Sequence, residues 1–62
     1  MKLTIKINMD NAAFENDHEL ECVRILAEFV KDLENGLTLS IGDNYPLMDF
    51  NGNTVGSVNV ST

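Results

Sequence analysis

The sequence predicts an α+β fold in which one amphipathic helix packs on one face of a small, mainly antiparallel sheet. Three observations carry this prediction: an alternating segment at residues 1–9, an amphipathic segment at residues 17–35, and the turn signal Asn51-Gly52. Their order predicts β-α-β-β, with a further strand if residues 37–41 also pair. Because the chain has 62 residues, we expect a single small α+β domain, residues 1–62, with one core.

Residues 1–9 form the first predicted strand. Apolar side chains at the odd positions alternate without a break with Lys2, Thr4, Lys6 and Asn8. Period-2 alternation is typical of a strand with one buried face and one solvated face. A strand covered on both faces would be apolar throughout. We therefore expect only one side of the sheet to be covered.

Residues 17–35 are predicted to form the helix. Asn16 is suited to the N-cap, and Glu19 lies three residues later, where it completes a capping box. Gly36 follows as a left-handed C-cap residue, with Leu37 folding back onto the last turn. Apolar residues recur at spacings of three and four and form one stripe: Cys22, Ile25, Leu26, Phe29, Val30 and Leu33. The opposite face is polar and includes an Arg24–Glu28 pair at i,i+4.

The last third of the chain is predicted to be a β-hairpin around Asn51-Gly52, because both residues tolerate the positive φ of tight turns. Two registers fit the sequence. A two-residue loop pairs Phe50 with Asn53, whereas a three-residue loop with Gly52 left-handed pairs Asp49 with Asn53. We favour the second register.

The favoured register places Met48 on the same face as Gly56, Val58 and Val60. Before the hairpin, residues 37–41 alternate as well, and they form either a short strand or an extended loop.

The charge balance is acidic. Four Lys and Arg residues stand against ten Asp and Glu residues, which gives a net charge of −6. Phosphate backbones and anionic membrane surfaces are bound by clustered basic residues, so neither partner is expected. The acidity favours solubility, a basic protein partner or mimicry of nucleic-acid charge. No stretch approaches the ~20 apolar residues of a membrane span, and the single Cys22 allows no intrachain disulfide. We therefore expect a cytoplasmic location.

A calcium loop is the first chemical motif to weigh. Asp49, Asn51 and Asn53 follow its 1, 3, 5 ligand spacing. Such a loop also needs Gly at position 6 and a bidentate acid at position 12, where this chain has Thr54 and Val60. We expect no metal and no cofactor.

His18 and Cys22 lie one helical turn apart and are the nearest approach to a catalytic pair. A nucleophile–base pair also needs an orienting group, an oxyanion site and a pocket. Because free cysteine is among the most buried residue types, we expect Cys22 to be a buried hydrophobic residue. The sequence thus indicates a protein that is not an enzyme.

Two surfaces are candidate binding sites. The outer helix face carries the predicted binding residues: Asp17, Glu21, Glu28, Asp32 and Glu34. The uncovered sheet face carries Lys2, Thr4, Lys6 and Asn8 of the first strand, and it is partly apolar if Val55 projects there. The unpaired edges of a small sheet also accept a strand from a partner.

Several segments carry a resemblance: the alternating first strand, Asn11 to Glu15, Arg24-Ile25-Leu26 in an acidic helix, and Asp49 to Gly56. Their order resembles that of short proteins encoded by bacteriophages and prophages, mostly of unassigned function. The resemblance spans nearly the whole chain except residues 38–45. It implies a phage-type accessory protein in the cytoplasm of a bacterial host cell, and it implies no catalytic or binding residues.

Size, acidity and this resemblance together predict a small non-enzymatic interaction protein that binds a host or phage protein through the acidic helix face. An inhibitor of a nucleic-acid-binding defence complex is one specific form of this hypothesis. The alternative is a homo-oligomeric structural or assembly accessory protein, for example a homodimer, that uses the exposed sheet face.

Overall fold

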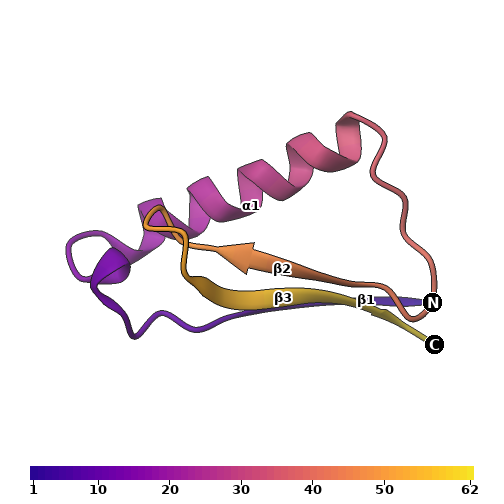
Figure 1. Cartoon of the computed structure of the whole chain (residues 1–62), viewed down its shortest axis with the longest axis horizontal. Helices are drawn as coiled ribbons and strands as arrows, with labels where there is room; N and C mark the ends of the chain where they lie inside the picture. The colour runs from indigo at the N-terminus through magenta and orange to yellow at the C-terminus, as the bar shows by residue number, and fades with distance from the viewer.

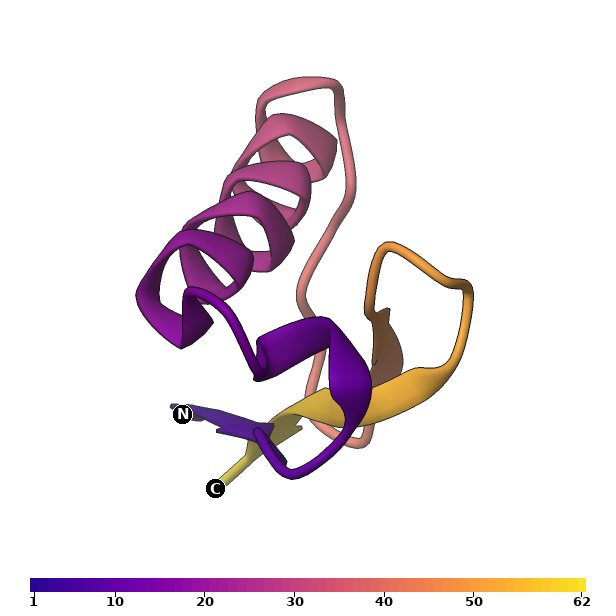
Figure 2. The same cartoon turned by 90° about the vertical axis from the view of Figure 1, so that its left-hand side faces the viewer.

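A computed structural model describes residues 1–62. The elements are β1 (Lys2–Ile7), a short 3-10 helix η1 (Ala12–Phe14), α1 (His18–Glu34), β2 (Asn44–Met48) and β3 (Thr54–Ser61). They form two layers, with α1 over one face of a three-stranded antiparallel sheet (Figures 1 and 2). The predicted α+β fold is confirmed. Residues 37–41 do not form a strand but belong to the connection between α1 and β2.

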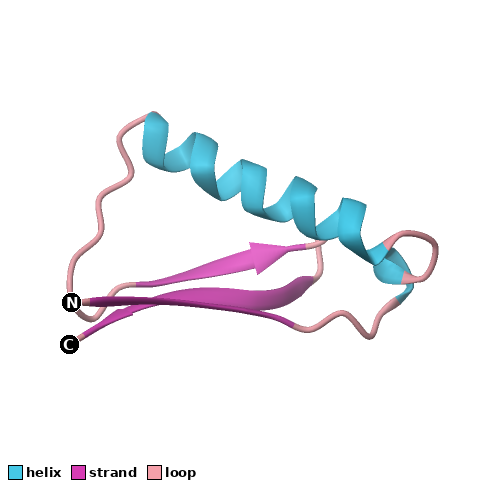
Figure 3. Cartoon of the chain, turned by 180° about the vertical axis from the view of Figure 1, so that it is seen from behind, coloured by secondary structure: helices cyan, strands magenta, loops and turns pink.

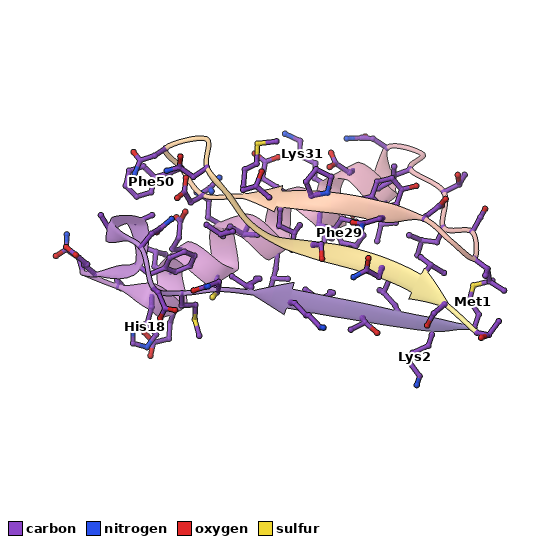
Figure 4. The ribbon with its side chains drawn as sticks, turned by 60° about the horizontal axis from the view of Figure 1, so that its bottom comes forward. Met1, Lys2, His18, Phe29, Lys31 and Phe50 are labelled. Atoms are coloured by element: carbon purple, nitrogen blue, oxygen red, sulfur yellow. The ribbon has the colours of Figure 1, made fainter.

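The central strand of the sheet is β3, in the order β1-β3-β2. Its residue Val58 pairs with Ile5 of β1 on one side and with Tyr45 of β2 on the other. Val58 is fully buried, so this row of side chains marks the face that α1 covers. The opposite face carries the polar residues of the alternation, and Figure 4 shows Lys2 directed away from the sheet there.

The helix begins one residue later than the expected cap. Asp17, not Asn16, is the N-cap, and its Oδ1 accepts a hydrogen bond from the Leu20 N–H at 2.9 Å. Glu19 is then the second helical residue instead of the third, so the predicted capping box does not form. Asp and Asn cap equally well, so adjacent Asn16 and Asp17 could not be separated by residue type.

The C-terminal end of α1 has the predicted cap. Gly36 has a φ of +107°, and its N–H donates to the Leu33 carbonyl at 3.2 Å. The Leu37 N–H donates to the Asp32 carbonyl at 2.9 Å. This pair of bonds is the Schellman arrangement, in which a left-handed glycine turns the chain back over the last turn.

The hairpin closes through the favoured three-residue loop. Gly52 has a φ of +84°, its N–H donates to the Asp49 carbonyl at 3.0 Å, and the Asp49 N–H donates to the Asn53 carbonyl at 2.9 Å. The predicted facing of Met48 is wrong, however. A bulge between Leu47 and Met48 makes Leu47 the partner of Gly56.

This bulge reverses the alternation along the hairpin, because one extra residue moves the following side chains to the other face. Leu47 is buried in the core, and Met48 is half exposed. Val55 is the extra residue of β3, between Thr54 and Gly56, and its side chain packs against the buried apolar core. It therefore does not make the uncovered sheet face apolar.

Six of the seven buried apolar residues form one cluster between the two layers: Ala13, Phe14, Ile25, Phe29, Leu47 and Val58. The seventh is Val60 of β3. Only Ile25 and Phe29 of the predicted helix stripe are buried, whereas Leu26 and Val30 are exposed. The reason is that α1 crosses the strands obliquely, starting over β1 and ending toward β2 (Figures 2 and 4). The loops lie at the two ends of the sheet, and the long connection after α1 shares one end with both termini (Figure 3).

At Gly56, β3 leaves no room for a side chain beside β1. A Cβ atom added there would overlap the Lys6 carbonyl oxygen and lie 3.0 Å from the Ile7 Cα. Because both neighbours are backbone atoms, one strand has to shift. We expect Gly56→Ala to lower the free energy of unfolding by on the order of 1–3 kcal/mol in urea denaturation.

The control for this variant is Ser61→Ala, an exposed position on the same strand, which should stay within about 0.5 kcal/mol of the original protein. Equal stability of Gly56→Ala and the original chain would show that β1 and β3 can separate at this point without cost.

Candidate interaction groove

A groove with a volume of about 510 Å³ runs between α1 and β2 and continues to the hairpin loop. Ile25, Phe29 and Leu47, all buried, form its floor. Its helix-side rim carries charged residues: Arg24, Glu28 and Asp32. An apolar floor beside a few polar groups is the usual make-up of a binding site in a small domain.

The groove exists because of the oblique crossing of α1. The first half of α1 lies toward β1, so the helix does not cover the end of β2 or the hairpin loop that follows it (Figure 2). Met48 and Phe50 are consequently 50% and 62% exposed along the sheet-side rim. Figure 4 shows Phe50 at the outer end of the hairpin, on the β2 side of the molecule.

A bridge between Glu21 and Arg24 joins α1 to the hairpin at one end of the groove. Arg24 Nε and Nη2 donate to Glu21 Oε1 and Oε2 at 3.0 and 3.1 Å. Arg24 Nη2 also donates to the Met48 carbonyl at 3.0 Å, and the Phe50 N–H donates to Glu21 Oε2 at 2.8 Å. Hydrogen bonds from Arg24 and Phe50 outweigh the effect of burial and lower the pKa of Glu21, and the same pairing raises the pKa of Arg24.

Asp49 fixes the shape of the hairpin loop. Its carboxylate is buried and accepts hydrogen bonds from the Asn51 and Asn53 N–H groups, both at 2.9 Å. Asn11 Nδ2, from the segment before η1, donates to the other oxygen at 2.6 Å. Burial alone would raise the pKa of Asp49, but the hydrogen bonds from Asn53, Asn11 and Asn51 lower it overall.

Tyr45 closes the other end of the groove. Its ring packs against Phe29, with centroids 6.4 Å apart and planes tilted by 46°. Its hydroxyl lies 2.7 Å from the Thr38 carbonyl and 3.1 Å from Asp43 Oδ2, which holds the connection after α1 against β2. Burial, reinforced by the Asp43 carboxylate, raises the pKa of Tyr45.

The structure separates the five acidic residues predicted for the outer helix face. Glu28 and Asp32 are exposed and line the groove. Asp17 caps the start of α1, and exposed Glu34 lies at the other end, outside the groove. Glu21 is only 6% exposed, so its predicted place on an exposed face is wrong.

Sequence reasoning also paired Arg24 with the wrong carboxylate. The expected Arg24–Glu28 bond is replaced by the Arg24–Glu21 bridge at i,i+3, which is the other spacing that brings helical side chains together. The contributions of Met48 and Phe50 to the groove were missed. The bulge explains the error for Met48, because it moves Met48 out of the predicted core row. Phe50 lies in the hairpin loop, whose position relative to α1 only the folded structure defines.

The residues considered as a catalytic pair or as a calcium loop do not form the groove floor. His18 Nε2 lies 3.1 Å from Glu19 Oε1, and the half-buried Cys22 has its Sγ 3.5 Å from Met9 Sδ. Asp49, Asn51 and Asn53 do gather, but through the loop hydrogen bonds described above. No cluster of three or more His, Cys, Asp or Glu side chains is arranged to hold a metal ion.

No helix in the structure combines the length and the apolar character needed to cross a membrane. Compared with family models, curated proteins and solved structures, the chain matches none of them. The candidate site therefore depends on its geometry alone.

The Glu21–Arg24 bridge predicts an acid-sensitive fold. The folded-state pKa values of Glu21 and Asp49 lie below their ordinary values of 4.5 and 3.8. A carboxyl group with a lowered pKa adds stability above its unfolded-state pKa, and this stability is lost as the pH falls through the folded-state pKa. We expect the free energy of unfolding, measured by urea denaturation, to fall as the pH decreases below about 4.5.

Glu21→Gln should be less stable at neutral pH and should lose less stability on acidification. The matched control is Glu34→Gln, because Glu34 is exposed and outside the bridge. If Glu21→Gln retains the full acid dependence of the original chain, the bridge is not its source.

Proposed function

We propose that the protein is a small, non-enzymatic interaction module that binds a basic, amphipathic segment of a protein partner in the groove between α1 and β2. The observation that supports this proposal is the position of Glu28 and Asp32. They are exposed, they lie one helical turn apart, and they border an apolar floor. An apolar anchor of the partner would pack over Phe29 and Leu47 while its Lys or Arg residues pair with the two carboxylates.

The charges around the groove favour a basic partner. Arg24 is bonded to Glu21 and Met48, and the Glu21 carboxylate balances its charge, although Arg24 also attracts Glu28 electrostatically. Over the whole chain the net charge is −6. A field of this sign increases the association rate of basic segments and disfavours acidic ones. The acidic surface proposed here is therefore narrower than the whole helix face and consists of Glu28, Asp32 and the adjacent floor.

The resemblance to short phage-encoded proteins supports a host or phage protein as the partner, inside a bacterial cell. A nucleic-acid-binding defence complex is a specific candidate, because surfaces that bind phosphate backbones are rich in Lys and Arg. In this form of the proposal, the protein occupies such a surface and prevents nucleic acid from binding.

The exposed sheet face supports the alternative function, homo-oligomerisation through that face, less well. Lys2, Thr4 and Lys6 share it with the polar residues Ser57 and Asn59 of β3. Val55, which would have made it partly apolar, packs against the core. A polar face with two lysines is poorly suited to binding its own copy.

A displayed library of short random peptides tests the proposed specificity. We expect the selected peptides to combine one large apolar residue with Lys or Arg residues, and their binding to weaken as salt rises. The double variant Glu28→Lys, Asp32→Lys should bind them about tenfold more weakly or worse, because two attractive contacts become repulsive.

The control is Glu15→Lys, Glu34→Lys, which makes the same change of charge at exposed positions outside the groove. It should retain most of the affinity. Selected peptides without basic residues, or equal losses in the two double variants, would contradict the proposed site.

A further inference from the structure

The two edges of the sheet differ in how their backbone groups are used. Along β2, the Val60 N–H bonds to the Asp43 carbonyl, and bonds between β3 and β2 recur at every second residue from there. The backbone N–H and C=O groups of the residues in between point away from the sheet, and these residues are Asn44, Pro46 and Met48. Pro46 has no N–H, and the Met48 carbonyl accepts the hydrogen bond from Arg24. The β2 edge is therefore closed to a further strand.

The β1 edge is open. The Asn8 N–H bonds to the Val55 carbonyl, so the outward-pointing groups of β1 belong to Leu3, Ile5 and Ile7. No proline or bulge interrupts this edge, and no side chain bonds to these groups. Unpaired edges of this kind accept another strand.

An apolar flank of α1 lies on the same side of the molecule. Arg24 and Glu21 bond to the hairpin after β2, while Cys22 contacts Met9, which follows β1. Residues on the Cys22 side of the helix therefore face the β1 side. At helical spacing from Cys22 this flank continues with Leu26, Val30 and Leu33.

This region is exposed because α1 ends toward β2 and leaves the start of β1 uncovered (Figures 2 and 4). Leu3 and Ile5 are 44% and 41% exposed although they lie on the face that α1 covers. Leu26 and Val30 are 37% and 52% exposed. Four partly exposed aliphatic side chains, two on the open strand and two on the helix flank that faces its side, are thus available to a partner that adds a strand at this edge.

We propose that β1 is a homodimer interface, at which β1 of a second copy pairs antiparallel to it and the three strands of each copy join in one sheet. A two-fold axis perpendicular to the sheet puts both helices on the same face. Leu26 and Val30 of the two copies then approach each other above the paired strands, and the exposed sides of Leu3 and Ile5 become buried.

The lysines of β1 select one register. If Ile5 pairs with Ile5 of the second copy, Leu3 pairs with Ile7 and all outward-pointing groups of both strands are bonded. In this register Lys6 faces Thr4, and Lys2 faces Asn8. A shift by two residues would place Lys2 opposite Lys6 of the second copy, and like charges directly opposite each other are destabilising.

The distribution of carboxylates favours a second copy as the occupant. Two chains of net charge −6 repel each other, so they associate best where carboxylates are absent. Between Cys22 and Leu33 the β1-side flank of α1 carries no charged residue, and Glu19 and Glu34 stand only at its two ends, whereas Glu21, Glu28 and Asp32 lie on the β2 side.

The test compares Val30→Glu with Met48→Glu. Both positions are about half exposed, at 52% and 50%, but they lie on opposite sides of the molecule. In sedimentation equilibrium at increasing concentration, the original chain and Met48→Glu should approach twice the mass of one chain. Val30→Glu should remain monomeric, and circular dichroism should show that it is folded.

Amide hydrogen exchange tests the pairing itself. The Leu3, Ile5 and Ile7 amides should become protected as the concentration rises in the original chain and should stay unprotected in Val30→Glu. The proposal is overturned by a monomeric original chain at the highest concentration, by equal association of the two Glu variants, or by a dimer whose three amides remain unprotected. None of these outcomes depends on peptide binding in the α1–β2 groove, so the two proposals fail separately.

Discussion

The arrangement of the two layers depends on the hydrogen bonds that the Glu21–Arg24 bridge makes to the hairpin. Glu21 is a buried anion, and burying it is tolerable only because Arg24 and the Phe50 N–H satisfy its oxygens. Removing one partner would leave the other charge with unmet hydrogen bonds. The bridge therefore holds the first half of α1 at one distance and orientation relative to the end of β2.

Three features of the surface follow from this position of α1. Arg24 and Glu21 join the first half of the helix to the hairpin after β2, and a groove with an apolar floor opens beyond this bridge. The same Arg24 bond occupies the carbonyl of Met48 and closes the β2 edge. Because the helix axis is oblique, the start of β1 stays uncovered at the diagonally opposite corner (Figure 4).

Because the core is small, the groove and the uncovered start of β1 are places where binding would add apolar burial that matters to stability. Only nine residues are buried, and two of them are the carboxylates Glu21 and Asp49. A 62-residue chain buries a smaller share of its surface than a larger domain, so each additional apolar contact matters more to its stability. A groove that accepts an apolar anchor and an edge that accepts a second copy both add burial that the isolated chain cannot provide. The oblique packing of α1 thus both limits the size of the core and leaves open the two surfaces proposed to bind partners.

The sequence by itself determined the features that depend on neighbouring residues. The glycine that ends the helix and the left-handed Gly52 of the hairpin loop involve bonds within a few residues, and both are found in the structure. The alternation of residues 1–9 likewise predicted a strand, which the structure has at Lys2–Ile7. Of the candidate site, the sequence predicted that Glu28 and Asp32 lie on an exposed face of the helix. Only the tertiary structure decided that Glu21 is buried, that Leu47 instead of Met48 faces the core, and that Leu26 and Val30 are exposed. The physical reason is that these outcomes depend on where the hairpin meets the helix, through a bond between residues 29 positions apart. Helical periodicity defines which side chains share a flank of the helix. Which flank is covered depends on the hairpin after β2, which is distant in the sequence.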